Sequence, residues 1–139
     1  MINQRMKLWI SRIEKLNTSI QPTSFNGSRE VWNCQLGINV GHEQNGDLNS
    51  FIRPVLVIQQ FGPHMLWVVP LSTKTPPNSP HHHVFEHDGN KYSALITQFR
   101  AIDLRRLTRK AYTLDRANYY EIQLHLARML LRQQNRTPD

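Results

Sequence analysis

A polar loop early in the chain holds side chains that could transfer a proton. His42 and Glu43 are adjacent in this loop, between Gly41 and Gly46, and glycine lets a backbone approach a ligand closely. A histidine titrates near neutral pH, so His42 could take a proton from a ribose 2′-hydroxyl or give one to a leaving oxygen. A histidine that is merely exposed in a loop would have the same sequence pattern.

Arg53 follows this loop and immediately precedes an apolar run, residues 54–58. Functional side chains are often found where a loop meets a rigid strand. The planar guanidinium suits a phosphate group, whose oxygens gain negative charge in a transition state. A surface arginine paired with Glu43 or Asp47 is the alternative that these residues leave open.

Further polar side chains follow two other predicted strands. The hydroxyl groups of Ser72 and Thr73 could hold a phosphate oxygen or orient a ribose. Hydroxyl groups at strand ends also commonly satisfy neighbouring backbone groups. Gln98 and Arg100 lie at the end of a later strand. If the strands close into a barrel, we expect these strand ends to share one rim with Arg53.

Each end of the chain has a helical pattern. Apolar residues near the N-terminus recur every three or four positions, which predicts an amphipathic helix that ends before Pro22. These residues are Ile2, Met6, Trp9 or Ile10, Ile13 and Leu16. Residues 23–28 predict a linker. Near the C-terminus, Asp115 is the predicted N-cap of a helix that runs to about Gln133. Its predicted apolar stripe is Tyr119, Ile122, Leu126, Met129 and Leu130.

The middle of the chain has the pattern of short strands. The predicted strands cover residues 31–36, 54–61, 65–70, 83–87 and 92–98. Gly62-Pro63-His64 and Asp88-Gly89-Asn90 predict tight hairpin turns, and residues 102–107 predict a single helical turn. Many short strands with regular turns favour a small barrel or sandwich, so the expected fold class is mainly β with helices (α+β).

The charge of the chain is basic and unevenly distributed. The formal net charge is +7, with residues 1–27 at +3, residues 28–99 at −1 and residues 100–139 at +5. This favours a polyanionic partner or an acidic protein, although a basic helix face is often only solvated. The single cysteine, Cys34, excludes an intramolecular disulfide and fits a reducing compartment. With no apolar stretch near about 20 residues, we expect a cytoplasmic protein without a membrane span.

Three consecutive histidines, His81, His82 and His83, are the only pattern that suggests a metal ion. Adjacent residues of an extended segment point to opposite faces, so such a run rarely converges on one ion. The chain has no phosphate-binding P-loop, dinucleotide fingerprint or Gly-x-Ser-x-Gly element. We therefore expect neither a native metal site nor a cofactor.

Several motifs occur in the order of one known family. They are Trp32 in the first strand, Gly41-His42-Glu43-Gln44-Asn45-Gly46, Arg53-Pro54-Val55-Leu56-Val57, Val69-Pro70-Leu71-Ser72-Thr73-Lys74, Gln98-Phe99-Arg100-Ala101-Ile102-Asp103 and Arg106-Leu107. In this order and spacing, residues 29–131 resemble the MazF/PemK family, the ribonuclease toxins of type II toxin–antitoxin systems. The N-terminal helix and the insertion of residues 47–52 look like those of a PemK-like branch.

The resemblance implies a fold, an activity and partners. The fold would be a small SH3-like β-barrel of the CcdB/PemK type with a C-terminal helix, usually a homodimer, and here with an extra N-terminal helix. Residues 1–27 would form the helix and linker, and residues 28–135 the toxin domain. The activity would be sequence-specific, metal-independent cleavage of single-stranded RNA, in which the 2′-hydroxyl attacks the neighbouring phosphate. A cognate antitoxin protein with an acidic tail would cover the RNA site.

The resemblance also assigns roles to individual residues. Arg53 matches the arginine that stabilises the transition state or takes part in proton transfer, and Ser72 matches a catalytic hydroxyl that is often threonine. His42 matches the histidine of the family motif, and His42 or Glu43 would assist catalysis. The implied RNA-binding residues are Gln44, Asn45, Thr73, Lys74, Gln98 and Arg100.

One departure from the family bears on catalytic activity, and the shared fold leaves a non-catalytic function open as well. Several members have an acidic residue directly before the glutamine that matches Gln98, whereas this chain has Thr97. If that acid transfers a proton, the chain would be a weaker enzyme, or His42 or Glu43 would supply the base. The alternatives are a non-catalytic CcdB-like gyrase inhibitor and an inactive RNA-binding barrel.

Overall fold

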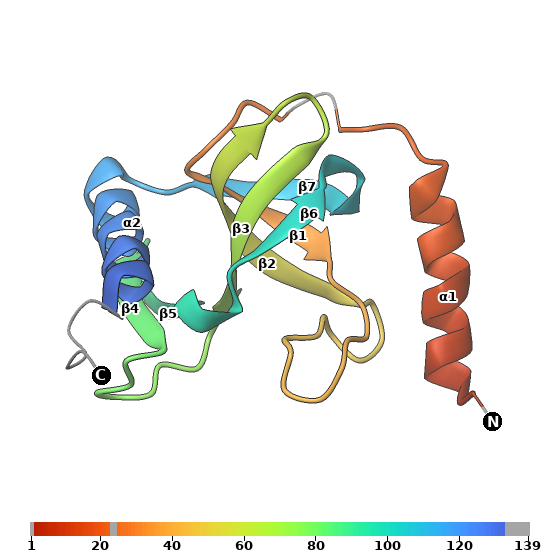
Figure 1. Ribbon diagram of the computed structural model, residues 1–139, viewed down its shortest axis with the longest axis horizontal. Coiled ribbons are helices and arrows are strands. Elements are labelled where there is room, and N and C mark those ends of the chain that lie inside the picture. The colour runs from red at the N-terminus through yellow and green to blue at the C-terminus, as the bar shows by residue number, and fades with distance from the viewer. Residues whose placement is uncertain (1, 23–24, 133–139) are drawn as a thin grey trace, which may run out of the picture.

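The computed structural model describes residues 2–22 and 25–132, which form a curled sheet with one helix on either side (Figure 1). The elements are α1 (Gln4–Asn17), β1 (Glu30–Gln35), β2 (Ile52–Phe61), β3 (Met65–Ser72), β4 (His82–His87), β5 (Asn90–Leu95), β6 (Arg100–Asp103), β7 (Leu107–Thr113), α2 (Arg116–Leu131) and the 3-10 turns η1 (Ile96–Gln98) and η2 (Leu104–Arg106). Neither α1 nor α2 combines the length and the apolar character that crossing a membrane requires.

The strands form one antiparallel sheet in the order β4-β5-β3-β2-β1-β7, and β6 pairs with the other part of β3. No ladder among the described residues joins β6 to β7, so the sheet curls without closing through hydrogen bonds. The predicted fold class, mainly β with a helix at each end, is confirmed. The name SH3-like barrel stays a prediction.

The central strands β2 and β3 are buried on both faces. Along β2, Leu56 and Ile58 belong to a core cluster that packs against α2, whereas Val55 and Val57 belong to a second cluster inside the curl of the sheet. Successive side chains of a strand point to opposite faces, which explains why residues 55–58 of β2 are apolar without alternation. The hairpin turn predicted at Gly62 is confirmed, with a positive φ of 66° at that glycine.

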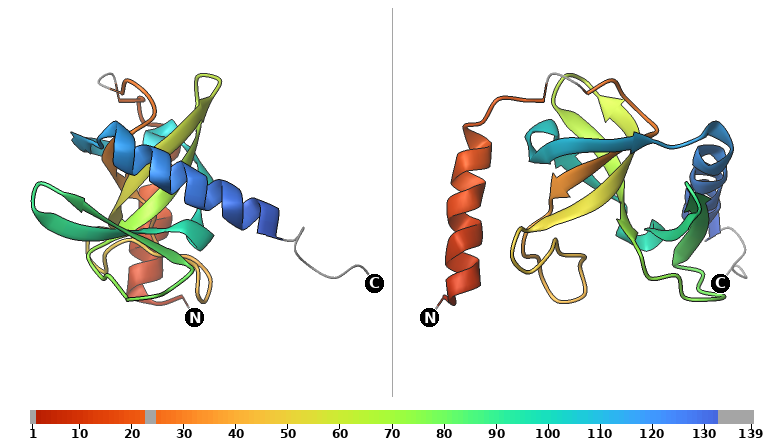
Figure 2. Two further views of the ribbon diagram at one scale, coloured as in Figure 1. Left: turned by 90° about the vertical axis from the view of Figure 1, so that its left-hand side faces the viewer. Right: turned by 180° about the vertical axis from the view of Figure 1, so that it is seen from behind.

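Helix α2 packs against the sheet through Tyr119, Ile122 and Leu126, which are buried in one core cluster. Asp115 caps the helix, as predicted, by accepting a hydrogen bond from the Asn118 amide. The Tyr119 hydroxyl donates to the Ile58 carbonyl oxygen at 2.5 Å. The predicted apolar stripe is wrong at Leu130, which is 64% exposed, because the helix runs past the edge of the sheet (Figure 2). The predicted end at Gln133 lies outside the described residues.

Helix α1 is confirmed as a helix, but it buries little of its predicted stripe. Trp9 is the buried side chain of α1, whereas Ile10, Ile2 and Ile13 are exposed. Residues 23 and 24 of the predicted linker lie outside the described residues.

Three other sequence predictions were inaccurate in the C-terminal half of the sheet. Strand β5 ends at Leu95 and is followed by the turn η1, whereas the prediction extended the strand to residue 98. The helical turn predicted over residues 102–107 is found, as the 3-10 turn η2, but it is shorter than predicted because β6 extends to Asp103 and β7 begins at Leu107. Strand β7 was not predicted, because most of its side chains are exposed or half-buried and so lack an apolar period.

Candidate functional site

The polar loop of residues 37–51 keeps its shape through hydrogen bonds rather than through a core. The Gly37 amide donates to the Phe51 carbonyl oxygen at 3.0 Å, which closes the loop at its base, and the Gly46 amide donates to the Gly37 carbonyl oxygen at 2.9 Å. A Cβ atom on Gly46 would lie 1.8 Å from the Phe51 carbonyl oxygen, so only glycine fits. The Asn39 amide donates to Oδ1 of Asn45 at 2.6 Å. The loop is therefore a defined structure that can present side chains.

Arg53 lies within β2, opposite Cys34 of β1, and not before the strand as its sequence position predicts. Its Nε donates to the Asn45 carbonyl oxygen at 2.8 Å and its Nη1 to the Leu71 carbonyl oxygen at 3.0 Å. Burial lowers the pKa of the Arg53 guanidinium, and the nearby charge of Asp47 partly opposes this. Two carbonyl groups, one from the loop and one from β3, thus fix the orientation of a half-buried positive charge.

A pocket of about 420 Å³ opens beside this guanidinium. Its lining includes Ser72, Thr73 and Lys74, all three of which were predicted site residues. The Ser72 Oγ accepts a hydrogen bond from the Lys74 amide at 3.1 Å, so this hydroxyl also stabilises its own turn. The pocket therefore combines a guanidinium, an ammonium and two hydroxyl groups, a set of groups that can hold a phosphate.

The same pocket contains residues that the sequence analysis did not assign to the site. Asp47, Tyr92 and Tyr112 line it together with Arg53. Tyr112 stacks on His87 with ring centroids 3.8 Å apart and planes at 12°, and burial raises the pKa of Tyr112 to about 12. Its hydroxyl is therefore protonated at neutral pH. Backbone hydrogen bonds from Asn49 and Ser50 lower the pKa of Asp47, which is therefore ionised.

His42 and Glu43 line a second pocket, of about 590 Å³, together with Gln44, Gln98 and Arg100. The Gln98 side chain holds the loop there: its Oε1 accepts from the Gln44 amide at 3.1 Å, and its Nε2 donates to the His42 carbonyl oxygen at 3.1 Å. Glu43 Oε1 accepts from the Val40 amide at 2.8 Å, which stabilises the turn of the loop. The exposed Thr97 also lines this pocket.

The predicted site residues other than Asn45 thus lie in two pockets. Arg53, Ser72, Thr73 and Lys74 share the first, and His42, Glu43, Gln44, Gln98 and Arg100 share the second. Asn45 connects them, because its carbonyl oxygen accepts from Arg53 and Gln44 directly precedes it. Neither Glu43 nor Asp47 forms an ion pair with Arg53 among the described residues. The catalytic and RNA-binding roles of these residues stay predictions.

The histidine run is divided between different partners. His82 Nδ1 lies 2.8 Å from the Ser79 hydroxyl, and His83 Nδ1 lies 3.0 Å from Nδ1 of His125 on α2. Within the described ranges, no three or more His, Cys, Asp or Glu side chains are grouped so that they could hold a metal ion.

Solved structures share this fold. The crystal structure of MazF from Deinococcus radiodurans superposes with a TM-score of 0.61 at 20% sequence identity, over 81% of this chain and 98% of that chain. An endoribonuclease from a mycobacterial species, solved in complex with its cognate antitoxin, superposes with a TM-score of 0.57 at 14% identity, over 82% of this chain and 100% of that chain. The architecture is therefore that of MazF toxins.

The sequence itself matches a family. Residues 28–130 match the PemK-like, MazF-like toxins of type II toxin–antitoxin systems. No curated protein matches the chain by sequence. Because the family match covers most of the sequence, the chain belongs to the PemK/MazF toxin family, as its motifs predicted.

Proposed function

We propose that this toxin is an endoribonuclease that cuts single-stranded RNA in a sequence-specific manner and without a metal ion. The observation that carries the proposal is the oriented guanidinium of Arg53 in a pocket with Lys74 and Ser72. Positive groups fixed in advance around a phosphate stabilise the charge that develops when the phosphorus is attacked. Membership in the toxin family supports the same activity.

The proposed reaction is an internal phosphoryl transfer. The ribose 2′-oxygen forms a bond to phosphorus while the bond from phosphorus to the 5′-oxygen breaks, which leaves a 2′,3′-cyclic phosphate and a 5′-hydroxyl. Arg53 and Lys74 bind the non-bridging oxygens, and Ser72 donates a hydrogen bond to one of them. Asp47, a carboxylate that lines the same pocket, is the candidate acceptor for the 2′-hydroxyl proton. The leaving 5′-oxygen takes a proton from solvent.

An RNA oligonucleotide with one altered sugar tests this reaction. Once the cut site is mapped, the nucleotide on its 5′ side is replaced by its 2′-deoxy form, which removes the attacking oxygen and leaves every base unchanged. We expect cleavage of that bond to be lost and the 2′-deoxy oligonucleotide to bind as a competitive inhibitor. Unchanged cleavage would show that water, rather than the 2′-hydroxyl, attacks the phosphate.

We propose that His42 and Glu43 bind the nucleotide next to the cut bond instead of transferring its protons, because they line the second pocket. His42→Ala should raise KM several-fold and leave kcat within about threefold of wild type, the pattern of a lost binding contact. Steady-state cleavage of a labelled oligonucleotide measures both constants. A kcat lowered about 100-fold at unchanged KM would instead make His42 a proton-transfer residue.

We propose that a cognate antitoxin restrains the toxin by covering these pockets with an acidic segment. The charge of +7 and the exposed Lys74 favour an acidic partner. The mycobacterial endoribonuclease with the same fold was solved with its antitoxin, which supports a partner of this kind. In this arrangement RNA and antitoxin compete for one surface in the cytoplasm, and residues 28–135 form the toxin domain that binds them.

We also propose that the toxin is a homodimer that buries the exposed side chains of the β2–β3 hairpin. Phe61, Met65 and Trp67 cluster there, with the rings of Phe61 and Trp67 4.5 Å apart and Trp67 41% exposed. Trp67→Glu should then convert the dimer into a folded monomer, because a charge in an apolar interface is costly to bury. Light scattering during gel filtration measures the mass, and a dimer that survives this substitution would place the interface elsewhere.

A further inference from the structure

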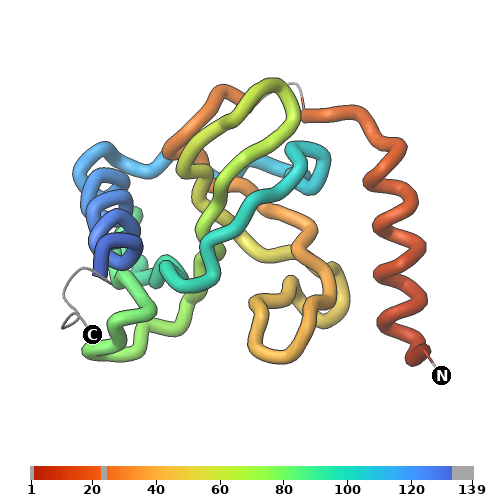
Figure 3. Tube along the Cα trace, in the orientation of Figure 1, coloured from red at the N-terminus to blue at the C-terminus, as the bar shows by residue number. Residues whose placement is uncertain are grey.

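Helix α1 lies outside the part of the chain that matches the toxin family, yet it runs beside the loop of residues 37–51 (Figure 3). Side chains of the helix contact this loop. Trp9 is the buried residue of this helix, at 4% exposure. Its indole ring covers the base of the loop, where a Cβ atom on Gly37 would lie 2.0 Å from Trp9 ring atoms. The Phe51 ring lies 5.3 Å away, centroid to centroid. The ring thus packs on both ends of the loop at once.

Charged side chains fix the helix around this contact. Arg5 Nε donates to the Leu48 carbonyl oxygen in the loop at 3.2 Å. Arg12 donates to Gln35 Oε1 at 3.0 Å and lies over the Phe51 ring at 5.9 Å. These contacts connect α1 to the loop from two further positions along one helix face.

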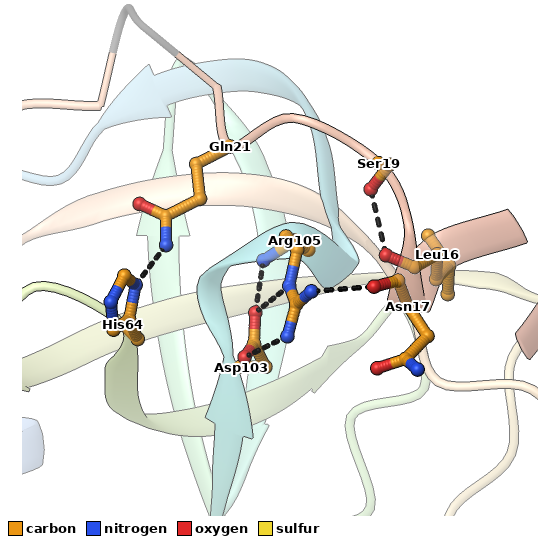
Figure 4. A network of polar contacts seen from close by, with 7 residues as sticks. All are labelled: Leu16, Asn17, Ser19, Gln21, His64, Asp103 and Arg105. Atoms are coloured by element: carbon orange, nitrogen blue, oxygen red, sulfur yellow. Dashed lines mark hydrogen bonds and ion pairs between the residues drawn. The ribbon is translucent and has the colours of Figure 1, made fainter.

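The C-terminal end of α1 is held separately. Arg105 Nη1 donates to the Asn17 carbonyl oxygen at 2.7 Å, while the same guanidinium forms a bidentate pair with Asp103 (Figure 4). A cation at the end of a helix interacts favourably with the helix dipole and with the unpaired carbonyl groups of the last turn. Gln21 contacts His64 in the same network. The helix is thus fixed at its far end, and not only at Trp9.

The base of the loop is directly connected to Arg53. Phe51 has a φ of 63°, unusual for a residue with a side chain, and its carbonyl oxygen accepts from the Gly37 amide. Arg53 follows two residues later, and its Nε is held by the Asn45 carbonyl oxygen of the same loop. Displacement of Phe51 would therefore move both Arg53 and the Asn45 carbonyl group that orients the Arg53 guanidinium.

We propose that α1 is a clamp that positions the active-site loop, with Trp9 as the positioning residue that acts through Gly37 and Phe51 on Arg53. Trp9 belongs to neither core cluster of the sheet, so the clamp acts on the site more than on the fold. The expected effect of Trp9 on the rate of RNA cleavage rests on the proposed ribonuclease function. Its expected effect on the structure of the 37–51 loop does not.

The test compares two variants of the protein, each with one alanine substitution in helix α1. Trp9→Ala removes the clamp, and Leu8→Ala, at a position that is 52% exposed, is the matched control. For Trp9→Ala we expect amide exchange in residues 37–51 to rise at least about tenfold while strands β2 and β3 stay protected. We expect kcat to fall about tenfold at nearly unchanged KM, because misplacement of a catalytic group slows the chemical step. Trp9→Phe, which keeps a ring on Gly37, should recover part of both effects.

Each outcome decides the proposal. If amide exchange in residues 37–51 of the Trp9→Ala variant is the same as in wild type, the proposal is overturned. It is also overturned if exchange rises in Trp9→Ala but its kcat equals that of the Leu8→Ala control. If Trp9→Ala does not fold, Arg5→Ala replaces it, since it removes the hydrogen bond to the Leu48 carbonyl oxygen and should raise exchange at residues 47–51. If the wild-type protein does not cut RNA, the ribonuclease proposal fails, and the exchange measurement alone decides whether Trp9 holds the loop.

Discussion

Replacing Arg53 with alanine should lower kcat for RNA cleavage by roughly 100- to 1,000-fold, the largest effect that we expect of any single substitution on activity. The guanidinium is held by two carbonyl groups and faces the pocket that contains Ser72 and Lys74. Because the guanidinium is oriented before the substrate binds, it can stabilise the negative charge that develops on the phosphate oxygens without first changing its own position. Single-turnover cleavage of a defined oligonucleotide measures the rate of the chemical step.

Two controls separate this catalytic effect from a structural one. Arg53→Lys keeps a positive charge but loses the planar fork that bonds both Asn45 and Leu71, so most of the activity should still be lost. Amide exchange of the 37–51 loop in both variants shows whether the loop has moved. A variant Arg53→Ala that cuts RNA within about threefold of the wild-type rate would remove Arg53 from the reaction.

Replacing Glu30 with alanine should cost about 2–3 kcal/mol in free energy of unfolding, the largest stability effect that we expect from a polar substitution. Glu30 is only 3% exposed. Its carboxylate accepts from Trp32 Nε1 and from the Asn26 amide, each at 3.0 Å, and forms an ion pair with Lys110 Nζ at 3.0 Å. Its loss leaves the buried indole N–H of Trp32 without a partner. Urea unfolding measures the cost, and Glu86→Ala, at an exposed position of β4, is the matched control.

The contribution of Glu30 should also depend on pH. Burial raises the pKa of Glu30, but the hydrogen bonds from Asn26, Trp32 and Lys110 together outweigh burial, so its folded-state pKa lies below the usual 4.5. The stabilisation is therefore complete above about pH 4.5 and is lost as the pH falls through the lowered folded-state value. The gap in unfolding free energy between wild type and Glu30→Gln should shrink over this acidic range. A gap that stays constant between neutral and acidic pH would contradict the assignment.

The sequence predicted those parts of the fold that local patterns determine. The apolar runs of β2 and β3, the turn at Gly62 and the N-cap at Asp115 have short-range physical causes, and each is found in the structure. Strand β7 was not predicted because it is an edge strand whose side chains are largely exposed to solvent. Its existence depends on pairing with β1, far away in the chain.

The arrangement of the site depended on contacts that spacing along the chain does not reveal. His42 and Arg53 are eleven positions apart in sequence, yet they line different pockets because Gln98 and Asn39 fix the path of the loop. Tyr112 was missed together with its strand. The role of Trp9 could not be predicted either, because the helical period of α1 fitted Trp9 and Ile10 equally well, and only the loop beside the helix distinguishes them.

Metal-independent ribonuclease activity can be tested by incubating the purified protein with a long single-stranded RNA in excess EDTA and mapping the ends of the fragments. Arg53→Ala, prepared in the same way, controls for a contaminating nuclease. We expect discrete cuts at a common sequence, with cyclic-phosphate and 5′-hydroxyl ends, that disappear in the variant. RNA that stays intact across several sequences would contradict this expectation and would favour a gyrase inhibitor or an RNA-binding protein without catalytic activity.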